Sequence, residues 1–151
     1  MNTLLMLNGP NLGTLGKRQS DIYGSMTLKD IEAMVTKEIV QKGWELKSVQ
    51  KDSEGDLIAA LQEHEDVVAA IINPGALMIA GWSFRDALAA FKPPWIEVHI
   101  SNIWAREPFR HHSILSDLAD GIVCGFGTLG YCLAAQAVIY KYAHDSKTEE
   151  L

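Results

Sequence analysis

The sequence predicts an α/β fold, a flavodoxin-like doubly wound sheet of five parallel strands in three layers. Three observations lead to this prediction. Short apolar runs alternate with helical patterns along the chain, which is typical of strands joined by right-handed helical crossovers. Some of these runs are apolar at every position, as in strands buried on both faces. The length of 151 residues suits one domain, and we expect residues 1–151 to form it.

The first strand and the first helix have clear ends. Residues 3–7 form a continuous apolar run that stops at Asn8-Gly9-Pro10. Residues 27–42 show the spacing of apolar side chains that is typical of a helix. Thr27, followed three residues later by Asp30, resembles a capping box at the start of this helix, and Gly43 closes it.

The middle of the chain repeats the alternation. Residues 44–50 alternate in polarity, which predicts a second strand. Ser53 is a suitable cap for a following helix that carries Leu57, Ile58 and Leu61. Residues 67–72 are continuously apolar and predict a third strand, which Asn73-Pro74-Gly75 stops.

The last part of the chain supplies two more strands. Residues 80–91 have a helical pattern, and Pro93-Pro94 separates them from a fourth strand at 95–99. A short fifth strand is expected at 122–124. Glycines then form a loop that leads into an apolar helix from about 131 to 142, and we expect residues from about 144 to 151 to be a polar, frayed tail.

The composition limits the classes of partner. A formal net charge of −6, with 21% charged residues, disfavours nucleic acids and anionic membranes, although a local basic patch can hold a small anion. Cys124 and Cys132 lack zinc-ligand spacing, and we expect small core residues rather than a disulfide or a metal site. The N-terminus does not resemble a signal peptide and no apolar run is long enough to span a membrane, which predicts a soluble cytoplasmic protein.

Polar side chains collect in loops after the predicted strands, where parallel sheets bind their ligands. The first of these loops, residues 8–24, is far longer than the usual connection of about two to six residues, and we expect a lid. It carries Arg18 and Tyr23. A guanidinium beside a tyrosine stabilises the phenolate, which can act as a base. A surface arginine beside a packed tyrosine is the alternative.

The fourth strand and its loop add acid–base and cationic groups. Glu97 and His99 lie two residues apart in a strand, so their side chains share one side and can meet. The carboxylate would then orient a general acid or base, or the pair would be purely structural. Arg106 and Arg110 have the spacing of one helical face and suit a bound carboxylate, unless they are solvated surface residues.

Six short segments carry a more specific signal. They are Leu7-Asn8-Gly9-Pro10-Asn11-Leu12-Gly13, Arg18 with Tyr23-Gly24, Ile72-Asn73-Pro74-Gly75-Ala76, Arg85-Asp86-Ala87-Leu88, Glu97-Val98-His99-Ile100-Ser101-Asn102 and Ala105-Arg106-Glu107-Pro108-Phe109-Arg110. Their order and spacing resemble those of the type II 3-dehydroquinate dehydratases, from residue 4 to about residue 142. The resemblance implies a lyase without a cofactor, assembled as a dodecamer built from trimers in which a neighbouring subunit completes each site. Aromatic amino acid biosynthesis through the shikimate pathway and quinate catabolism both use this elimination, and both remain open.

The resemblance also implies a role for each site residue. Tyr23, as phenolate, would remove the proton next to the ketone of 3-dehydroquinate, and His99, oriented by Glu97, would protonate the departing hydroxyl group. Arg18 would favour the phenolate and close with the lid, Arg106 would support the charge around Tyr23, and Asn11 would help to stabilise the enolate. The residues that would hold the substrate are Asn73, Gly75, Asp86, Ile100, Ser101 and Arg110, with Ile79 at a further substrate-binding position.

Two segments depart from the family pattern. After Ala76 the family usually has a large residue followed by Thr-His-Thr-Ser, whereas this chain has Leu77-Met78-Ile79-Ala80-Gly81. With Ile79 in place of the histidine, substrate hydroxyls lose a partner, at about 1–3 kcal/mol for each group left unpaired. The enzyme would then pair these hydroxyls differently, or act on a less hydroxylated cyclic acid. Gln19-Ser20 replaces a common Glu-Pro, which predicts a looser lid.

Two other classes of protein fit the sequence less well. Gly125-Phe126-Gly127-Thr128-Leu129-Gly130 satisfies the GxGxxG pattern of nucleotide-binding modules. It follows the fifth strand, however, and the acidic residue about 20 positions further on lies in the predicted tail. An inactive assembly subunit would have no need to keep the predicted base, acid and arginines together at one edge of the sheet.

Overall fold

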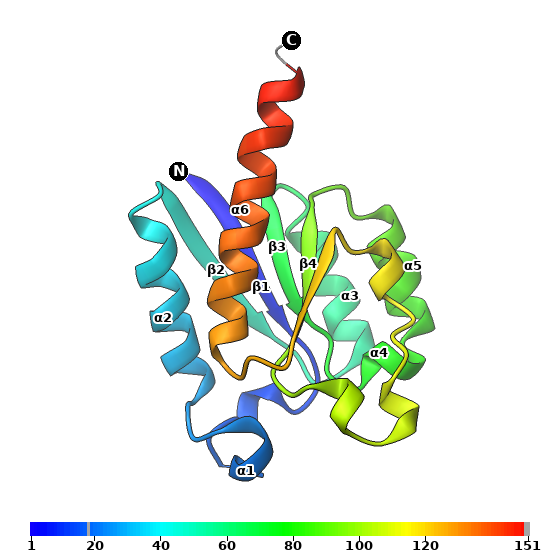
Figure 1. Ribbon diagram of the computed structural model, residues 1–151. Coiled ribbons are helices and arrows are strands. Elements are labelled where there is room, and N and C mark those ends of the chain that lie inside the picture. Colours follow the sequence, from blue (N-terminus) through cyan, green and yellow to red (C-terminus); the bar gives the residue numbers. More distant parts are fainter. Residues whose placement is uncertain (18, 150–151) are drawn as a thin grey trace.

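A computed structural model describes residues 1–17 and 19–149 of the chain. Its five strands form one parallel sheet in the order β2-β1-β3-β4-β5, which confirms the predicted flavodoxin-like α/β fold (Figure 1). The strands are β1 (Asn2–Asn8), β2 (Trp44–Gln50), β3 (Ala69–Asn73), β4 (Trp95–His99) and β5 (Gly121–Cys124). The chain reverses its direction of growth between β1 and β3, and such a switch point opens a crevice for ligands at the carboxyl ends of the strands.

Helices cover both faces of the sheet because successive side chains of a strand point to opposite sides. Leu4 and Met6 of β1 pack with α2 (Leu28–Val40) and α6 (Leu129–Glu149), which lie in front of the sheet in Figure 1. Leu5 and Leu7 pack on the other face with α3 (Glu54–Glu63) and α5 (Trp82–Ala90). The fully apolar runs of the sequence are therefore the strands at the centre of three layers.

The predicted helix starts are confirmed by their hydrogen bonds. Thr27 Oγ1 accepts from the Asp30 N–H at 3.2 Å, and Asp30 Oδ2 accepts from the Thr27 N–H at 2.9 Å, which completes a capping box for α2. Ser53 Oγ accepts from the Asp56 N–H at 3.1 Å at the start of α3. Each cap satisfies backbone donors that a helix leaves unpaired in its first turn.

The helix predicted over 80–91 is confirmed as α5, and a further single turn that was not predicted, α4 (Leu77–Ala80), precedes it and is separated from it at Gly81. The backbone of Gly81 turns back so closely that a Cβ atom there would lie 2.7 Å from the Leu77 carbonyl oxygen. This close approach requires glycine and ends α4 after a single turn.

The last helix is longer than predicted, because α6 continues to Glu149 rather than ending at about residue 142. The frayed tail expected from about residue 144 stays a prediction. No glycine or proline occurs between residues 131 and 149 to end the helix. Residues 150–151 lie outside the described part of the chain. Both cysteines are free; Cys132 is buried, as predicted, and Cys124 is half-buried.

Several short elements gather beyond the carboxyl ends of the strands, at the bottom of Figure 1. They are η1 (Leu12–Thr14), α1 (Ser20–Tyr23), η2 (Ile103–Ala105) and η3 (Pro108–Arg110), together with α4. The turn η4 (Ser116–Leu118) lies instead beside α5, just before β5 begins. The described helices include none with the length and apolar character needed to cross a membrane.

Candidate active site

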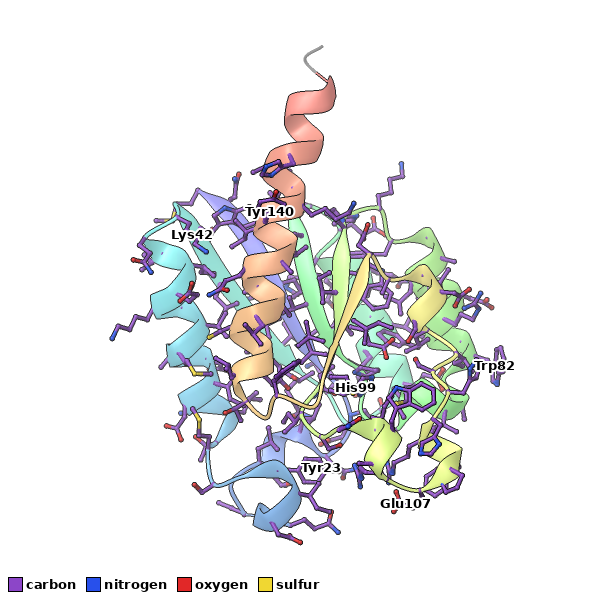
Figure 2. All side chains as sticks on the ribbon, viewed as in Figure 1. Tyr23, Lys42, Trp82, His99, Glu107 and Tyr140 are labelled. Carbon is purple, nitrogen blue, oxygen red and sulfur yellow. The ribbon has the colours of Figure 1, made fainter. Side chains whose placement is uncertain are left out.

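A cavity of about 180 Å³ lies at the carboxyl ends of β1, β3 and β4. The first loop lines one side of the cavity, and the loops after β3 and β4 line the remaining sides. Most of the predicted site residues line it, namely Asn11, Tyr23, Asn73, Gly75, His99, Ile100, Ser101, Arg106 and Arg110. Figure 2 shows Tyr23 and His99 at the same end of the sheet, from segments far apart in the sequence.

Glu97 and His99 meet as the strand spacing predicts. Glu97 Oε2 lies 2.5 Å from Nε2 of His99, and both side chains are buried. The other carboxylate oxygen, Oε1, accepts hydrogen bonds from the hydroxyl groups of Ser113 at 3.1 Å and Ser116 at 2.9 Å. His99 faces the cavity with its ring held from behind by Glu97, an arrangement suited to proton transfer.

Tyr23 reaches the cavity from α1 and meets Arg106. The Nη1 group of Arg106 donates to the phenolic oxygen of Tyr23 at 2.9 Å and lies 3.2 Å from Ser101 Oγ. The guanidinium carbon is 5.5 Å from the centre of the tyrosine ring. A fixed positive charge at this distance stabilises negative charge on the phenolic oxygen. The other arginine assigned to this role, Arg18, lies outside the described residues.

The spacing of Arg106 and Arg110 predicted that they lie on one face of a helix, but the two residues do not share a helix. Arg106 follows the short turn η2, and Arg110 is the last residue of the separate turn η3, because Pro108 begins a new turn. Both guanidinium groups nevertheless line the cavity. Arg110 Nε donates to Glu107 Oε2 at 2.7 Å, and the pKa of Glu107 is lowered by its own backbone N–H and by this hydrogen bond. The cavity therefore has a cationic wall that suits an anion.

The start of the first loop is fixed by a carboxylate outside the predicted site. Asn11 has a left-handed backbone with φ of 70°, and its N–H donates to Asp52 Oδ1 at 3.0 Å. Gln50 Nε2 donates to the same oxygen at 2.9 Å and to the Gly9 carbonyl at 3.1 Å. The Asn11 N–H, and then Gln50, hold the pKa of Asp52 below its usual value.

A buried polar network that the sequence analysis missed supports Asn73. Asn73 Nδ2 donates to the Tyr131 hydroxyl at 2.9 Å, and this hydroxyl donates to Asn8 Oδ1 at 2.7 Å. The Gly75 N–H donates to Asn73 Oδ1 at 3.1 Å. Burial raises the pKa of Tyr131, so its hydroxyl group stays protonated and donates. A tyrosine within an apolar helix, and an asparagine ending an apolar strand, were the available signals.

Two predicted substrate-binding residues lie away from the cavity lining. Asp86 is exposed on α5. Ile79 is half-buried on α4, and it is Met78 of the same helix, with Ala76, that lines the cavity. The segment that departs from the family pattern therefore contributes the apolar side chain of Met78 to the cavity, and not that of Ile79.

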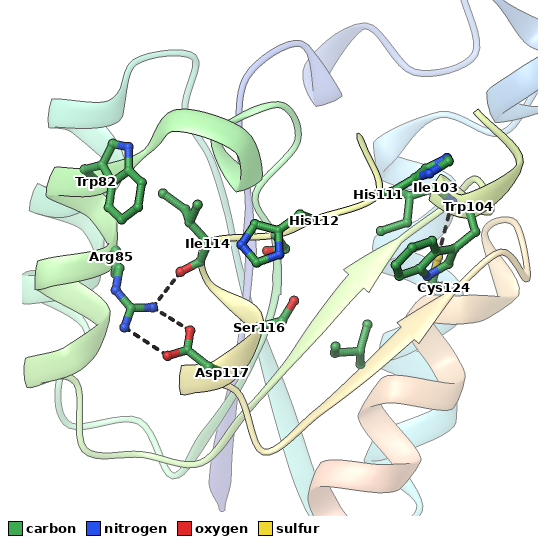
Figure 3. Close-up of a pocket in the computed structure, with 12 residues that line it drawn as sticks. Trp82, Arg85, Ile103, Trp104, His111, His112, Ile114, Ser116, Asp117 and Cys124 are labelled. Carbon is green, nitrogen blue, oxygen red and sulfur yellow. Dashed lines mark hydrogen bonds and ion pairs between the residues drawn. The ribbon is translucent and has the colours of Figure 1, made fainter. Parts of the chain in front are cut away.

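A second, more open cavity of about 540 Å³ adjoins the first (Figure 3). Ile103 lines both cavities, and the exposed rings of Trp82 and Trp104 border the second one. Arg85 closes one side by pairing with Asp117 through two hydrogen bonds, of which the Nη2 bond to Oδ2 measures 2.9 Å. Among the described residues, no group of three or more His, Cys, Asp or Glu side chains is placed to hold a metal ion.

The fold and the site define a flavodoxin-like α/β protein with acid–base groups and arginines around one cavity. Residues 2–139 match the family described as dehydroquinase class II. A 3-dehydroquinate dehydratase from Actinobacillus pleuropneumoniae serotype 5b (strain L20) is 49% identical over 140 residues, covering 92% of this chain and 91% of that protein. One from Janthinobacterium sp. (strain Marseille) is 46% identical over 140 residues, covering 91% and 97%.

A solved structure with a dehydroquinase fold is similar to this chain along almost its whole length. The crystal structure of the type II dehydroquinase from Propionibacterium acnes superposes with a TM-score of 0.86 at 37% identity, covering 95% of this chain and 97% of that one. The chain belongs to the class II dehydroquinase family, which confirms the resemblance carried by the six sequence segments.

Proposed function

We propose that this enzyme removes water from 3-dehydroquinate to give 3-dehydroshikimate, with Tyr23 as the base and His99 as the acid. One observation carries the proposal: Tyr23 and His99 line the same cavity, and each has the partner its role requires. Arg106 donates to the phenolic oxygen of Tyr23 at 2.9 Å, and Glu97 lies 2.5 Å from the ring of His99. The relatives that carry the name 3-dehydroquinate dehydratase support the choice of substrate.

The reaction then proceeds through an enolate. The Tyr23 phenolate takes the proton from the carbon next to the ketone, and the electron pair moves onto the ketone oxygen. The enolate collapses, the bond to the hydroxyl group breaks, and protonated His99 gives its proton to the departing oxygen, so that water leaves and a conjugated enone forms. Arg106 stabilises the phenolate, Glu97 stabilises the charged imidazole, and Asn11 helps to stabilise the enolate. Arg18 is proposed, from the resemblance, to assist Tyr23.

The substrate carboxylate binds on the cationic wall in this proposal. Arg110, Ser101 and Asn73 line that part of the cavity, together with the backbone of Ile100 and Gly75. An anionic cyclic acid matches this lining because guanidinium, hydroxyl and amide groups all donate hydrogen bonds to a carboxylate.

The test is the appearance of the conjugated enone, followed by ultraviolet absorbance after purified protein is mixed with 3-dehydroquinate. We expect turnover by the wild type and its loss in Tyr23→Phe. Tyr140→Phe is a matched control, because Tyr140 is exposed on α6 and lies far from the cavity in Figure 2. Undiminished activity in Tyr23→Phe would overturn the assignment of the base.

A second candidate function keeps the same reaction type on a less hydroxylated cyclic acid. It is favoured by Met78 and Ala76, which give the cavity an apolar side. Comparison of kcat/KM for 3-dehydroquinate and for a deoxy analogue separates the two candidates. If the second is right, the analogue is the better substrate.

The proposal includes assembly from several copies of the chain, as a dodecamer built from trimers. Asp86 is exposed and does not line the cavity of its own chain, so any contact with the substrate must come from a neighbouring copy. Mixing inactive Tyr23→Phe with Asp86→Ala and refolding them together should restore part of the activity, because some sites then receive an intact residue from each copy. A monomer in sedimentation experiments, or no restoration, would contradict shared sites.

A further inference from the structure

Glu97 is enclosed by hydrogen-bond partners on both of its oxygens. Oε2 lies 2.5 Å from Nε2 of His99, and Oε1 accepts hydrogen bonds from the hydroxyl groups of Ser113 at 3.1 Å and Ser116 at 2.9 Å. Glu97 has no exposed surface. The two serines come from the segment between η3 and β5, far from β4 in the sequence but adjacent to it in the fold.

The direction of these hydrogen bonds is fixed by their surroundings. Ser113 Oγ accepts from the Leu115 N–H at 3.2 Å, so its own proton is directed to Glu97. Ser116 begins the short turn η4, whose backbone holds its hydroxyl group against the same oxygen. Both serines also line the second cavity, where Ser116 is labelled in Figure 3. They therefore separate the buried carboxylate from that open space.

These contacts determine what Glu97 can do for His99. An ionised carboxylate without exposed surface is stable only when donors surround it. With Oε1 occupied by two hydroxyl groups, Oε2 is the oxygen that remains for the imidazole. The ring then donates from Nε2 and leaves Nδ1, which has no partner among the described residues, for a ligand in the cavity.

We propose that Ser113 and Ser116 are positioning residues for catalysis, which act through Glu97 to keep the His99 ring in one tautomer and orientation. This inference rests on the proposed function, in which His99 is the acid. It assigns a catalytic purpose to a segment that does not touch the reaction cavity.

The kinetic test compares Ser113→Ala/Ser116→Ala with the wild type. General acid catalysis contributes about 10²–10⁴-fold, so partial loss of positioning should lower kcat by about tenfold while KM changes less than about twofold. The pH–rate profile should shift as well, because the charge of the imidazole is less well supported. Ser116→Thr in the Ser113 wild-type background keeps the hydroxyl group and should keep the activity. Ser83→Ala, an exposed serine of α5, is the control.

A double-mutant cycle with Glu97→Gln shows whether the serines act through Glu97. We expect the two alanine substitutions to have no further effect on kcat in the Glu97→Gln background. Additive losses, or a fall in thermal stability with unchanged kcat and pH profile, would show a structural role only and would overturn the proposal.

A spectroscopic readout keeps this test independent of the substrate. Long-range ¹H–¹⁵N correlation spectra of the free protein report which ring nitrogen of His99 carries the proton. We expect the Nε2-protonated form in the wild type and a mixture of tautomers in the double alanine variant. If the wild type fails to dehydrate 3-dehydroquinate, the proposed function fails while this measurement still decides the positioning claim. An unchanged spectrum in the variant would refute it.

Discussion

The guanidinium of Arg106 lies 2.9 Å from the phenolic oxygen of Tyr23, joining the loop after β4 to the long first loop. These residues are separated by 83 positions in the sequence. The same guanidinium also reaches Ser101 Oγ at 3.2 Å, so one side chain holds both the proposed base and the proposed carboxylate site. The arrangement places one positive charge beside both side chains.

Arg106 should therefore affect the chemical step more than substrate binding. Hydrogen bonds to charged groups are worth about 1.5–3 kcal/mol, so Arg106→Gln should reduce kcat by about 10–100-fold. Arg106→Lys keeps the positive charge but lacks the planar guanidinium group. Its kcat should therefore lie between those of the wild type and Arg106→Gln. Steady-state kinetics measure the effect, with the exposed Lys92→Gln as the control. A rise in KM at constant kcat would show that Arg106 serves binding alone.

Tyr131 should make the protein sensitive to alkaline pH. Burial raises the pKa of Tyr131 in the folded state above the value of about 10 expected after unfolding. Its contribution to stability is therefore complete below pH 10 and is lost as the pH rises through the folded pKa, by about 1.4 kcal/mol per pH unit. Urea unfolding between pH 8 and pH 11 measures this slope.

Tyr131→Phe isolates that contribution. At pH 8 the variant should be less stable by about 1–3 kcal/mol, because the buried Asn8 and Asn73 side chains each lose a partner. Above pH 10 the gap to the wild type should close, since the variant has no phenol to ionise at this position. A gap that stays constant with pH would be inconsistent with a buried, protonated Tyr131.

The first loop should be the part of the chain most open to proteolysis. Gln19 has φ of 34°, a backbone region that a residue with a side chain rarely adopts, and it directly precedes α1. We expect proteinase K to cut first within residues 15–22. Gln19→Glu/Ser20→Pro should slow this cut by at least about threefold, because proline favours the first helical position and restricts the open loop. Sparing of this segment in the wild type would contradict the looser lid.

Local patterns were enough to predict the sheet and the contact between Glu97 and His99. The period-two alternation placed Glu97 and His99 on one side of β4, and the capping residues marked the starts of α2 and α3. The single turn α4 was missed because its four residues are too few to show a helical spacing, and the backbone folds back on Leu77 at Gly81. The separate turns η2 and η3 were missed because the spacing of Arg106 and Arg110 alone matches that of one helix.

Contacts between distant segments could not be read from the sequence. The hydroxyl of Tyr131 reaches Asn8 across 123 positions, and the serines that hold Glu97 are 16 and 19 residues beyond it. Such pairs are defined by the packing of α6 and of the η4 segment against the sheet, rather than by any local period. The proposed roles of Tyr23 and His99 come from the resemblance, and the structure places Arg106 beside Tyr23 and Glu97 beside His99.

The division of labour between Tyr23 and His99 can be measured directly by exchange of the substrate proton next to the ketone in deuterated water. His99→Ala should still exchange this proton without releasing water, because the base is intact and the enolate can return to the ketone. Tyr23→Phe should do neither, and nuclear magnetic resonance of the recovered 3-dehydroquinate distinguishes the two variants. Exchange in Tyr23→Phe as fast as in His99→Ala would contradict the account.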